Sequence, residues 1–195
     1  MVLRMTSAKP WASEVSRVFA ALFAERPAAR VAIFGVGNEL AGDDAAGSLV
    51  VRSLLQLTTP PEDLLILNGG HAPESYIGKL EAFVPDLVLI VDATDLGAVP
   101  GTISFLDMSR VAGKLPSTHT LSLTVLTHYL QQAVACQVYL LGIQPQTVAF
   151  DAPLTPVAFE AVEKVTQFLH ELVKVPKCQK ADLASSVMQN HVSNI

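Results

Sequence analysis

Three side chains that can bind a divalent metal ion lie near the ends of predicted strands or the start of a helix: Asp44, Asp92 and His119. Asp92 ends a nearly continuous apolar run, where burying a carboxylate is costly unless it is paired or bound to a metal. Carboxylate oxygens and imidazole nitrogens are ligands that borderline divalent metals accept. The three residues match no local metal-binding spacing, so a shared site depends on the fold.

Each of these residues also has an ordinary structural explanation. Asp43 and Asp44 precede a helical segment, where a carboxylate can cap the helix or interact favourably with its dipole. Asp92 can serve as a hydrogen-bond acceptor, and His119 can be a surface or capping residue at a helix start. Two adjacent acids can divide these roles, so we expect Asp43 to support the helix start and Asp44 to face a metal.

The segment 35–44 also invites a dinucleotide-binding interpretation, because it begins with Gly-Val-Gly after a predicted strand. The Gly-x-Gly-x-x-Gly pattern fails at its third glycine, where Leu40 stands. Asp43 and Asp44 would repel a pyrophosphate at this position. A nucleotide-binding module is therefore retained only as an alternative.

The spacing of apolar residues predicts the elements that position these side chains. Short apolar runs predict strands over 30–35, 64–68, 87–93, 102–107 (an edge strand) and 137–143. Helical spacing predicts helices over 11–25, 45–57, 74–83, 120–133 and 156–173. This alternation implies a three-layer α/β/α fold with a twisted, mostly parallel sheet flanked by helices. Ligands of such sheets gather beyond the carboxyl ends of the strands, which is where Asp44 and Asp92 stand.

The composition fits one globular domain of the α/β class. Half of the 195 residues are hydrophobic and the mean hydropathy is +0.41, which excludes a disordered chain. A net charge of −5 without a basic cluster excludes a nucleic-acid groove. No apolar run reaches the roughly 18 residues of a membrane span, and no secretory signal is evident. We therefore expect a cytoplasmic protein without a membrane partner, in which Cys136 and Cys178 are free thiols.

Six segments resemble, in order, the signature of the hydrogenase maturation endopeptidases. They are Gly-Val-Gly-Asn-Glu-Leu-Ala-Gly-Asp-Asp at 35–44, Asn-Gly-Gly-His-Ala-Pro-Glu at 68–74, Val-Asp-Ala-Thr-Asp at 91–95, Pro-Gly at 100–101, Ser-Thr-His at 117–119 and Leu-Gly-Ile-Gln-Pro at 141–145. The most similar branch is the one that serves hydrogenases of the formate-hydrogenlyase (hydrogenase 3) type. The motif order, rather than any single motif, makes the resemblance specific.

The resemblance implies a phosphorylase/hydrolase-like fold and an endopeptidase grouped with the aspartic type. Its substrate would be the nickel-loaded large-subunit precursor of a [NiFe] hydrogenase, from which it removes a C-terminal peptide. The resemblance implies that Asp44, Asp92 and His119 contact the nickel, which the precursor supplies, and carry the catalysis. Weaker candidates, for substrate binding, are Asn38, Asp43, Gly69, Gly70 and His71. A surface role is the simpler explanation for His71.

A second function is compatible with the same residues. A non-enzymatic chaperone that binds nickel or the precursor would use them but would leave the length of the precursor unchanged. In either case we expect residues 1–29 to be an N-terminal extension with an amphipathic helix, 30–173 to be the protease domain and 174–195 to be a mobile tail. We also expect a monomer.

Overall fold

Five strands form one sheet in the order β2-β1-β3-β5-β4. Their bounds are Val31–Val36 (β1), Leu64–Gly70 (β2), Leu87–Ala93 (β3), Ile103–Asp107 (β4) and Gln137–Ile143 (β5). The pairs β1–β2, β1–β3 and β3–β5 are parallel, while β4 pairs antiparallel with β5 at the edge. This computed structural model describes residues 10–110 and 120–175. The predicted mostly parallel sheet and its edge strand are confirmed.

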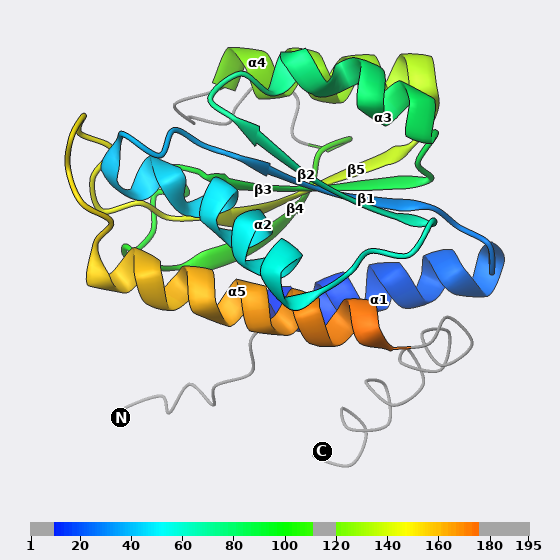
Figure 1. Cartoon of the computed structure of the whole chain (residues 1–195), viewed down its shortest axis with the longest axis horizontal. Coiled ribbons are helices and arrows are strands. Elements are labelled where there is room, and N and C mark those ends of the chain that lie inside the picture. The colour runs from blue at the N-terminus through cyan, green and yellow to red at the C-terminus, as the bar shows by residue number, and fades with distance from the viewer. Residues whose placement is uncertain (1–9, 111–119, 176–195) are drawn as a thin grey trace.

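Helices cover both faces of this sheet (Figure 1). One face carries α1 (Pro10–Glu25), α2 (Ala46–Leu57) and α5 (Pro156–Lys174), and the other carries α3 (Ile77–Phe83) and α4 (Thr120–Tyr129). Two short 3-10 turns, Gly42–Ala45 (η1) and Pro73–Tyr76 (η2), precede α2 and α3. A π-helical turn, Leu130–Val134 (η3), follows α4. The predicted three-layer α/β/α architecture is confirmed.

The core divides into two clusters, one on each face of the sheet. All residues of β1 and β3 are buried, as expected for parallel strands covered by helices on both sides. One cluster joins these strands to α1, α2 and α5, with Phe19 and Leu54 among its fully buried members. The other joins them to α3 and α4 through Phe34, Leu80 and Leu126. Packing on both faces thus holds the sheet, and with it the ends of its strands, in place.

Residues 1–9, 111–119 and 176–195 lie outside the described part of the chain. The predictions for His119, for Cys178 and for most of the segment 174–195 therefore fall outside it. Within residues 10–110 and 120–175, no helix is long and apolar enough to span a bilayer. Cys136 is a buried free thiol, and burial raises its pKa to about 11.

Candidate functional site

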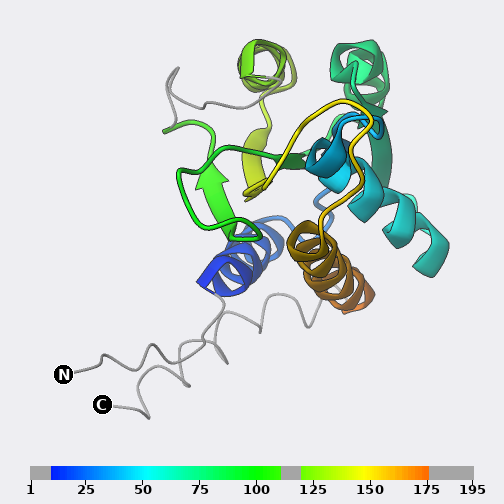
Figure 2. The ribbon, with the colours of Figure 1, turned by 90° about the vertical axis from the view of Figure 1, so that its left-hand side faces the viewer.

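The loops that follow β1, β2, β3 and β5 meet at one edge of the sheet, because the carboxyl ends of parallel strands point the same way. Figure 2 turns this edge toward the viewer, and the yellow loop after β5 arches across the start of α2. Backbone bonds tie it to the loop after β1: Asp43 N–H donates to Thr147 O (2.9 Å) and Asp151 N–H to Leu40 O (2.7 Å). Loops from separate strands therefore form one surface.

Glycine allows the start of α2 to lie directly on the strand ends. A Cβ on Gly47 would lie 2.1 Å from Val91 O and 2.2 Å from Val36 O, distances that real side chains do not reach. Gly37 has a φ of +149°, and a Cβ there would lie 1.9 Å from Asp44 O. Only glycine fits such contacts. The close approach holds η1, and with it Asp44, against the end of β3.

The structure brings two of the three predicted metal contacts together. Asp44 is 3% exposed and Asp92 is fully buried. The Asn38 N–H donates to Asp44 Oδ2 (2.8 Å), and the Thr94 hydroxyl donates to Asp92 Oδ2 (3.2 Å). The third predicted contact, His119, immediately precedes α4 but lies outside the described residues. The described part of the chain holds no group of three His, Cys, Asp or Glu side chains placed to bind a metal ion.

Burial raises the pKa of Asp92 well above its usual value, and the charge of Asp44 raises it further. Hydrogen bonds from Thr94 and from the Ala93 backbone act in the opposite direction. Two acids close enough to influence each other in a water-excluded place do not readily ionise together. The site therefore disfavours the ionised form of Asp92, which a nearby cation would favour.

The raised pKa of Asp92 predicts a pH-dependent stability difference between the wild type and Asp92→Asn. In the unfolded chain the carboxyl ionises first, so ionisation of Asp92 favours unfolding as the pH rises toward the folded pKa. Its stabilising contribution is present below the unfolded pKa and is lost above the folded one. We expect Asp92→Asn to gain stability relative to the wild type from about pH 4 upward. Urea unfolding of both proteins across this range measures the difference; a constant or shrinking difference contradicts the prediction.

Asp43 is fully buried, and its carboxylate binds the loop between β5 and α5. Oδ2 accepts hydrogen bonds from the backbone of Gln146 (2.7 Å) and Thr147 (3.3 Å) and from the Thr155 hydroxyl (2.9 Å). Oδ1 accepts from Thr155 N–H (2.7 Å). Neither η1 nor α2 has a side-chain cap. Asp43 lies in the first turn of η1, as predicted, but the expectation that its side chain caps a helix is wrong, because four donors from another loop satisfy its carboxylate.

We expect Asp43→Ala to destabilise the protein by about 2–4 kcal/mol, because several buried donors lose a charged acceptor. The segment 144–155 should also exchange its amide hydrogens faster. Glu163→Ala, at an exposed position of α5, is the matched control and should change stability by less than about 0.5 kcal/mol. Urea unfolding and hydrogen exchange measure both effects. Equal stability of the two variants contradicts this assignment.

The other predicted substrate-binding residues lie along the same edge. Asn38 is half-buried, and its Oδ1 accepts a hydrogen bond from Leu40 N–H (3.0 Å). Gly69 lies at an irregularity of the β1–β2 register, and a Cβ there would overlap the Phe34 ring (2.6 Å). Gly70 has a φ of +55° and accepts a hydrogen bond from Gly37 N–H, and His71 is exposed. The structure thus places all of them at the carboxyl edge. At position 69, packing against Phe34 explains why the residue is glycine.

Gln144, which directly follows β5, is a residue that the sequence analysis did not single out. Its Oε1 accepts hydrogen bonds from Leu96 N–H (2.6 Å) and Ala98 N–H (3.2 Å), and its Nε2 donates to Asp95 Oδ1 (3.2 Å). The buried side chain thereby holds the loop after β3 in place. Its position at a strand end, as for Asp92, is the signal that would have identified it.

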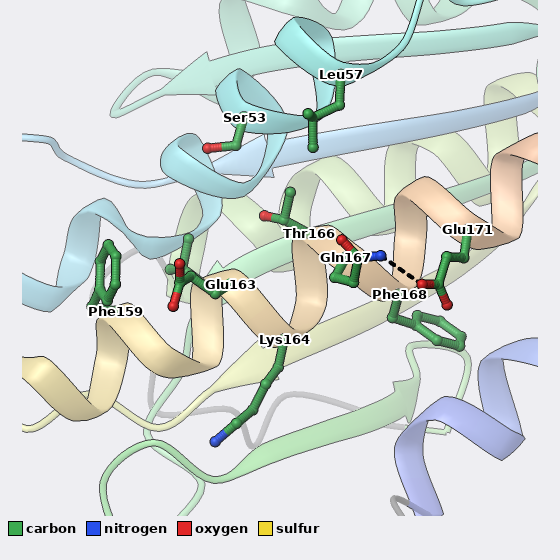
Figure 3. A pocket seen from close by; sticks show the side chains of 10 residues that line it. Ser53, Leu57, Phe159, Glu163, Lys164, Thr166, Gln167, Phe168 and Glu171 are labelled. Atoms are coloured by element: carbon green, nitrogen blue, oxygen red, sulfur yellow. Dashed lines mark hydrogen bonds between the residues drawn. The ribbon is translucent and has the colours of Figure 1, made fainter.

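A cavity of about 320 Å³ lies between the loops that follow β3 and β5, and residues that include Ala93, Asp95, Gln144 and Val148 line it. A larger groove of about 740 Å³ lies between α2 and α5 (Figure 3). Ser53 and Leu57 of α2 line one side of this groove, and α5 residues such as Phe159 line the other. None of the residues that line the groove is a predicted site residue. The groove between α2 and α5 is therefore not the candidate site, which lies at the carboxyl edge of the sheet.

Comparison with known proteins gives concordant matches. The family model described as hydrogenase maturation protease matches residues 49–172. The chain is 38% identical over 135 residues to the hydrogenase 3 maturation protease of Escherichia coli K12, covering 69% of this chain and 85% of that relative.

Solved structures agree with this assignment. The crystal structure of the [NiFe] hydrogenase maturation protease HycI from Thermococcus kodakarensis has a TM-score of 0.72 and 35% identity, covering 81% of this chain and 99% of that one. The solution structure of the endopeptidase HycI from Escherichia coli has a TM-score of 0.62 and 34% identity, covering 73% and 90%. The fold, the acidic pair at the sheet edge and these matches together show that the chain belongs to the hydrogenase maturation protease family.

Proposed function

We propose that this peptidase removes a C-terminal peptide from the nickel-loaded large-subunit precursor of a [NiFe] hydrogenase. Family membership supports proteolysis in hydrogenase maturation, and the names of similar proteins specify hydrogenase 3 and [NiFe] hydrogenase. In this proposal nickel belongs to the substrate and is not held permanently by the protease. The precursor is the partner, and the reaction takes place in the cytoplasm.

The acidic pair at the carboxyl edge is the observation that carries the proposal. Asp44 and Asp92 are almost completely buried, and the charge of Asp44 contributes to the raised pKa of Asp92. A cation would offset the cost of ionising Asp92 here, and perturbed acids of this kind gather at functional sites. We assign the two carboxylates and the imidazole of His119 as contacts to the nickel of the precursor. Both acids come from one chain, so a monomer suffices.

The chemistry follows from charge and proximity. A divalent cation favours the ionised form of Asp92, so binding of the nickel-loaded precursor would offset the cost of ionising this buried carboxyl. Docking places the scissile bond beside the site, which lowers the entropic part of the barrier. Attack by water is then assisted either by a carboxylate acting as a general base or by polarisation of the carbonyl. The first route is the aspartic type that the family resemblance implies.

A cysteine nucleophile is a poor alternative within the described residues. Cys136 is buried beneath η3, its thiol donates to Leu130 O (3.6 Å), and burial raises its pKa to about 11. A thiol with this pKa carries almost no thiolate at neutral pH, and the thiolate is the reactive form. Among the described residues, hydrolysis by activated water is therefore a better explanation than a covalent intermediate on Cys136.

The test is an anaerobic incubation of the purified protein with the precursor in its nickel-loaded and nickel-free forms, followed by intact-mass analysis. We expect the mass to fall by a C-terminal peptide only in the nickel-loaded sample. Binding without a loss of mass would support the chaperone alternative instead. Equal cleavage of both forms would show that the protease does not read nickel.

A further inference from the structure

Four large apolar side chains are exposed on the loops around the acidic pair. Leu40 follows β1, Val99 follows β3, and Val148 and Phe150 follow β5. Leu40 is 62% exposed, and Val99 and Phe150 are each 76% exposed. Clustered apolar exposure of this kind marks an interaction surface more often than it occurs by chance. These four residues are called the docking surface below.

Fixed loops, rather than loose ones, present this surface. The Asp151 N–H donates to Leu40 O, which places Phe150 beside the loop after β1. The Asp43 carboxylate holds the backbone of Gln146 and Thr147, which leads directly into Val148. On the other side, the Gln144 side chain holds Leu96 and Ala98 beside Val99. Ordered exposure lowers the entropic cost of binding a partner.

The charged residues of the four loops at this edge of the sheet are all acidic. The loops 37–45, 70–76, 94–102 and 144–155 contain six acidic residues and no lysine or arginine: Glu39, Asp43, Asp44, Glu74, Asp95 and Asp151. Arg52 of α2 pairs with Glu39. Asp95 also lines the cavity between the loops after β3 and β5. Complementary charge on a partner would steer it to this edge.

From these observations we propose that the docking surface binds a non-polar stretch of the precursor that carries basic residues, next to the scissile bond. The inference rests on the proposed function, because the loops that present the surface follow β1, β3 and β5 at the edge of the sheet where Asp44 and Asp92 lie. A second copy of this chain is a poorer occupant, since two acidic edges would repel each other. The docking surface thus binds the polypeptide of the precursor, while the acidic pair contacts its nickel.

The test compares wild type with the double variant Leu40→Ser, Phe150→Ser on the nickel-loaded precursor. We expect KM to rise at least about 10- to 100-fold, since leaving even one large apolar side chain without its contact costs that much, with a smaller effect on kcat. Among single variants at position 150, Phe150→Ser should raise KM, whereas Phe150→Leu, which keeps an apolar side chain, should have a KM close to that of the wild type. Leu57→Ser is the matched control: Leu57 is 51% exposed, at the far end of α2, about 18 Å away along the helix.

Several outcomes decide the matter. An unchanged KM in the double variant overturns the docking surface and leaves the protease function intact. If the wild type binds the precursor tightly without cleaving it, the proposed protease function is wrong, but the docking surface is still supported. A change of oligomeric state by light scattering, with KM unchanged, would assign the surface to a second copy. If the KM of the wild type does not rise with added salt, the claim that the bound stretch of the precursor carries basic residues is wrong. Thermal unfolding confirms that the variants fold.

Discussion

Asp92→Asn is expected to lower the rate of precursor processing by roughly 10²- to 10⁴-fold. The substitution keeps the shape of the side chain but removes its charge and its capacity to exchange a proton. Asp92 is fully buried at the end of β3, and burial and the charge of Asp44 both raise its pKa. An amide in the same place binds a cation weakly and cannot act as a base. Intact-mass kinetics on the nickel-loaded precursor measure the loss.

The same variant should unfold at a higher temperature than the wild type at pH 8. Asparagine carries no charge, so it avoids both the cost of burying a charge and the repulsion from Asp44. The free energy of unfolding therefore rises while activity is lost. A substitution that lowers activity but raises stability identifies an acid that serves function, because replacing a structural acid would lower stability. Glu163→Gln, an exposed acid of α5, serves as the control and should change neither property. Normal processing by Asp92→Asn would remove Asp92 from the proposed mechanism.

His119→Ala is expected to lower processing at least about 100-fold, because loss of groups that only support metal ligands already costs about 10- to 100-fold. The family resemblance assigns His119 as the nitrogen ligand, and α4 begins at the next residue, Thr120. Added imidazole should restore part of the activity by filling the place of the missing side chain. Single-turnover assays with and without imidazole measure both effects.

The control for this variant is His128→Ala, an exposed histidine on the same helix. It should process the precursor at the rate of the wild type and should not respond to imidazole. Equal rates for both histidine variants would leave the acids as the only metal contacts and would contradict the proposed trio.

The sequence predicted the strands and helices well because the sheet is buried on both faces. Runs such as 87–93 are apolar throughout and have no other stable place than a covered strand. The predicted boundaries differ from the structure where a helix begins in a 3-10 turn. Residues 42–45 and 73–76 form such turns, and the end of the predicted helix 120–133 is a π-helical turn. Local periodicity does not distinguish these variants of helical structure.

The candidate site could be predicted only in part. Asp92 stood out because an acid ends an apolar strand, but its proximity to Asp44 depends on Gly47 fitting against the strand ends. Asp43 was assigned to a helix cap because its real partners lie 103, 104 and 112 positions away. Gln144 was overlooked for the same reason, since it holds a loop that precedes it by almost 50 positions. Tertiary hydrogen bonds of this kind leave no local pattern.

Nickel X-ray absorption on a stalled complex tests the central claim most directly. The precursor is measured alone and after mixing with Asp92→Asn, which keeps Asp44 and His119 but should turn over too slowly to release the product. We predict that the nickel gains oxygen and nitrogen ligands, including the outer-shell signal of an imidazole. The imidazole signal should vanish when His119→Ala is added to the variant. An unchanged nickel shell in a complex shown to form by gel filtration would contradict nickel recognition by Asp44 and His119.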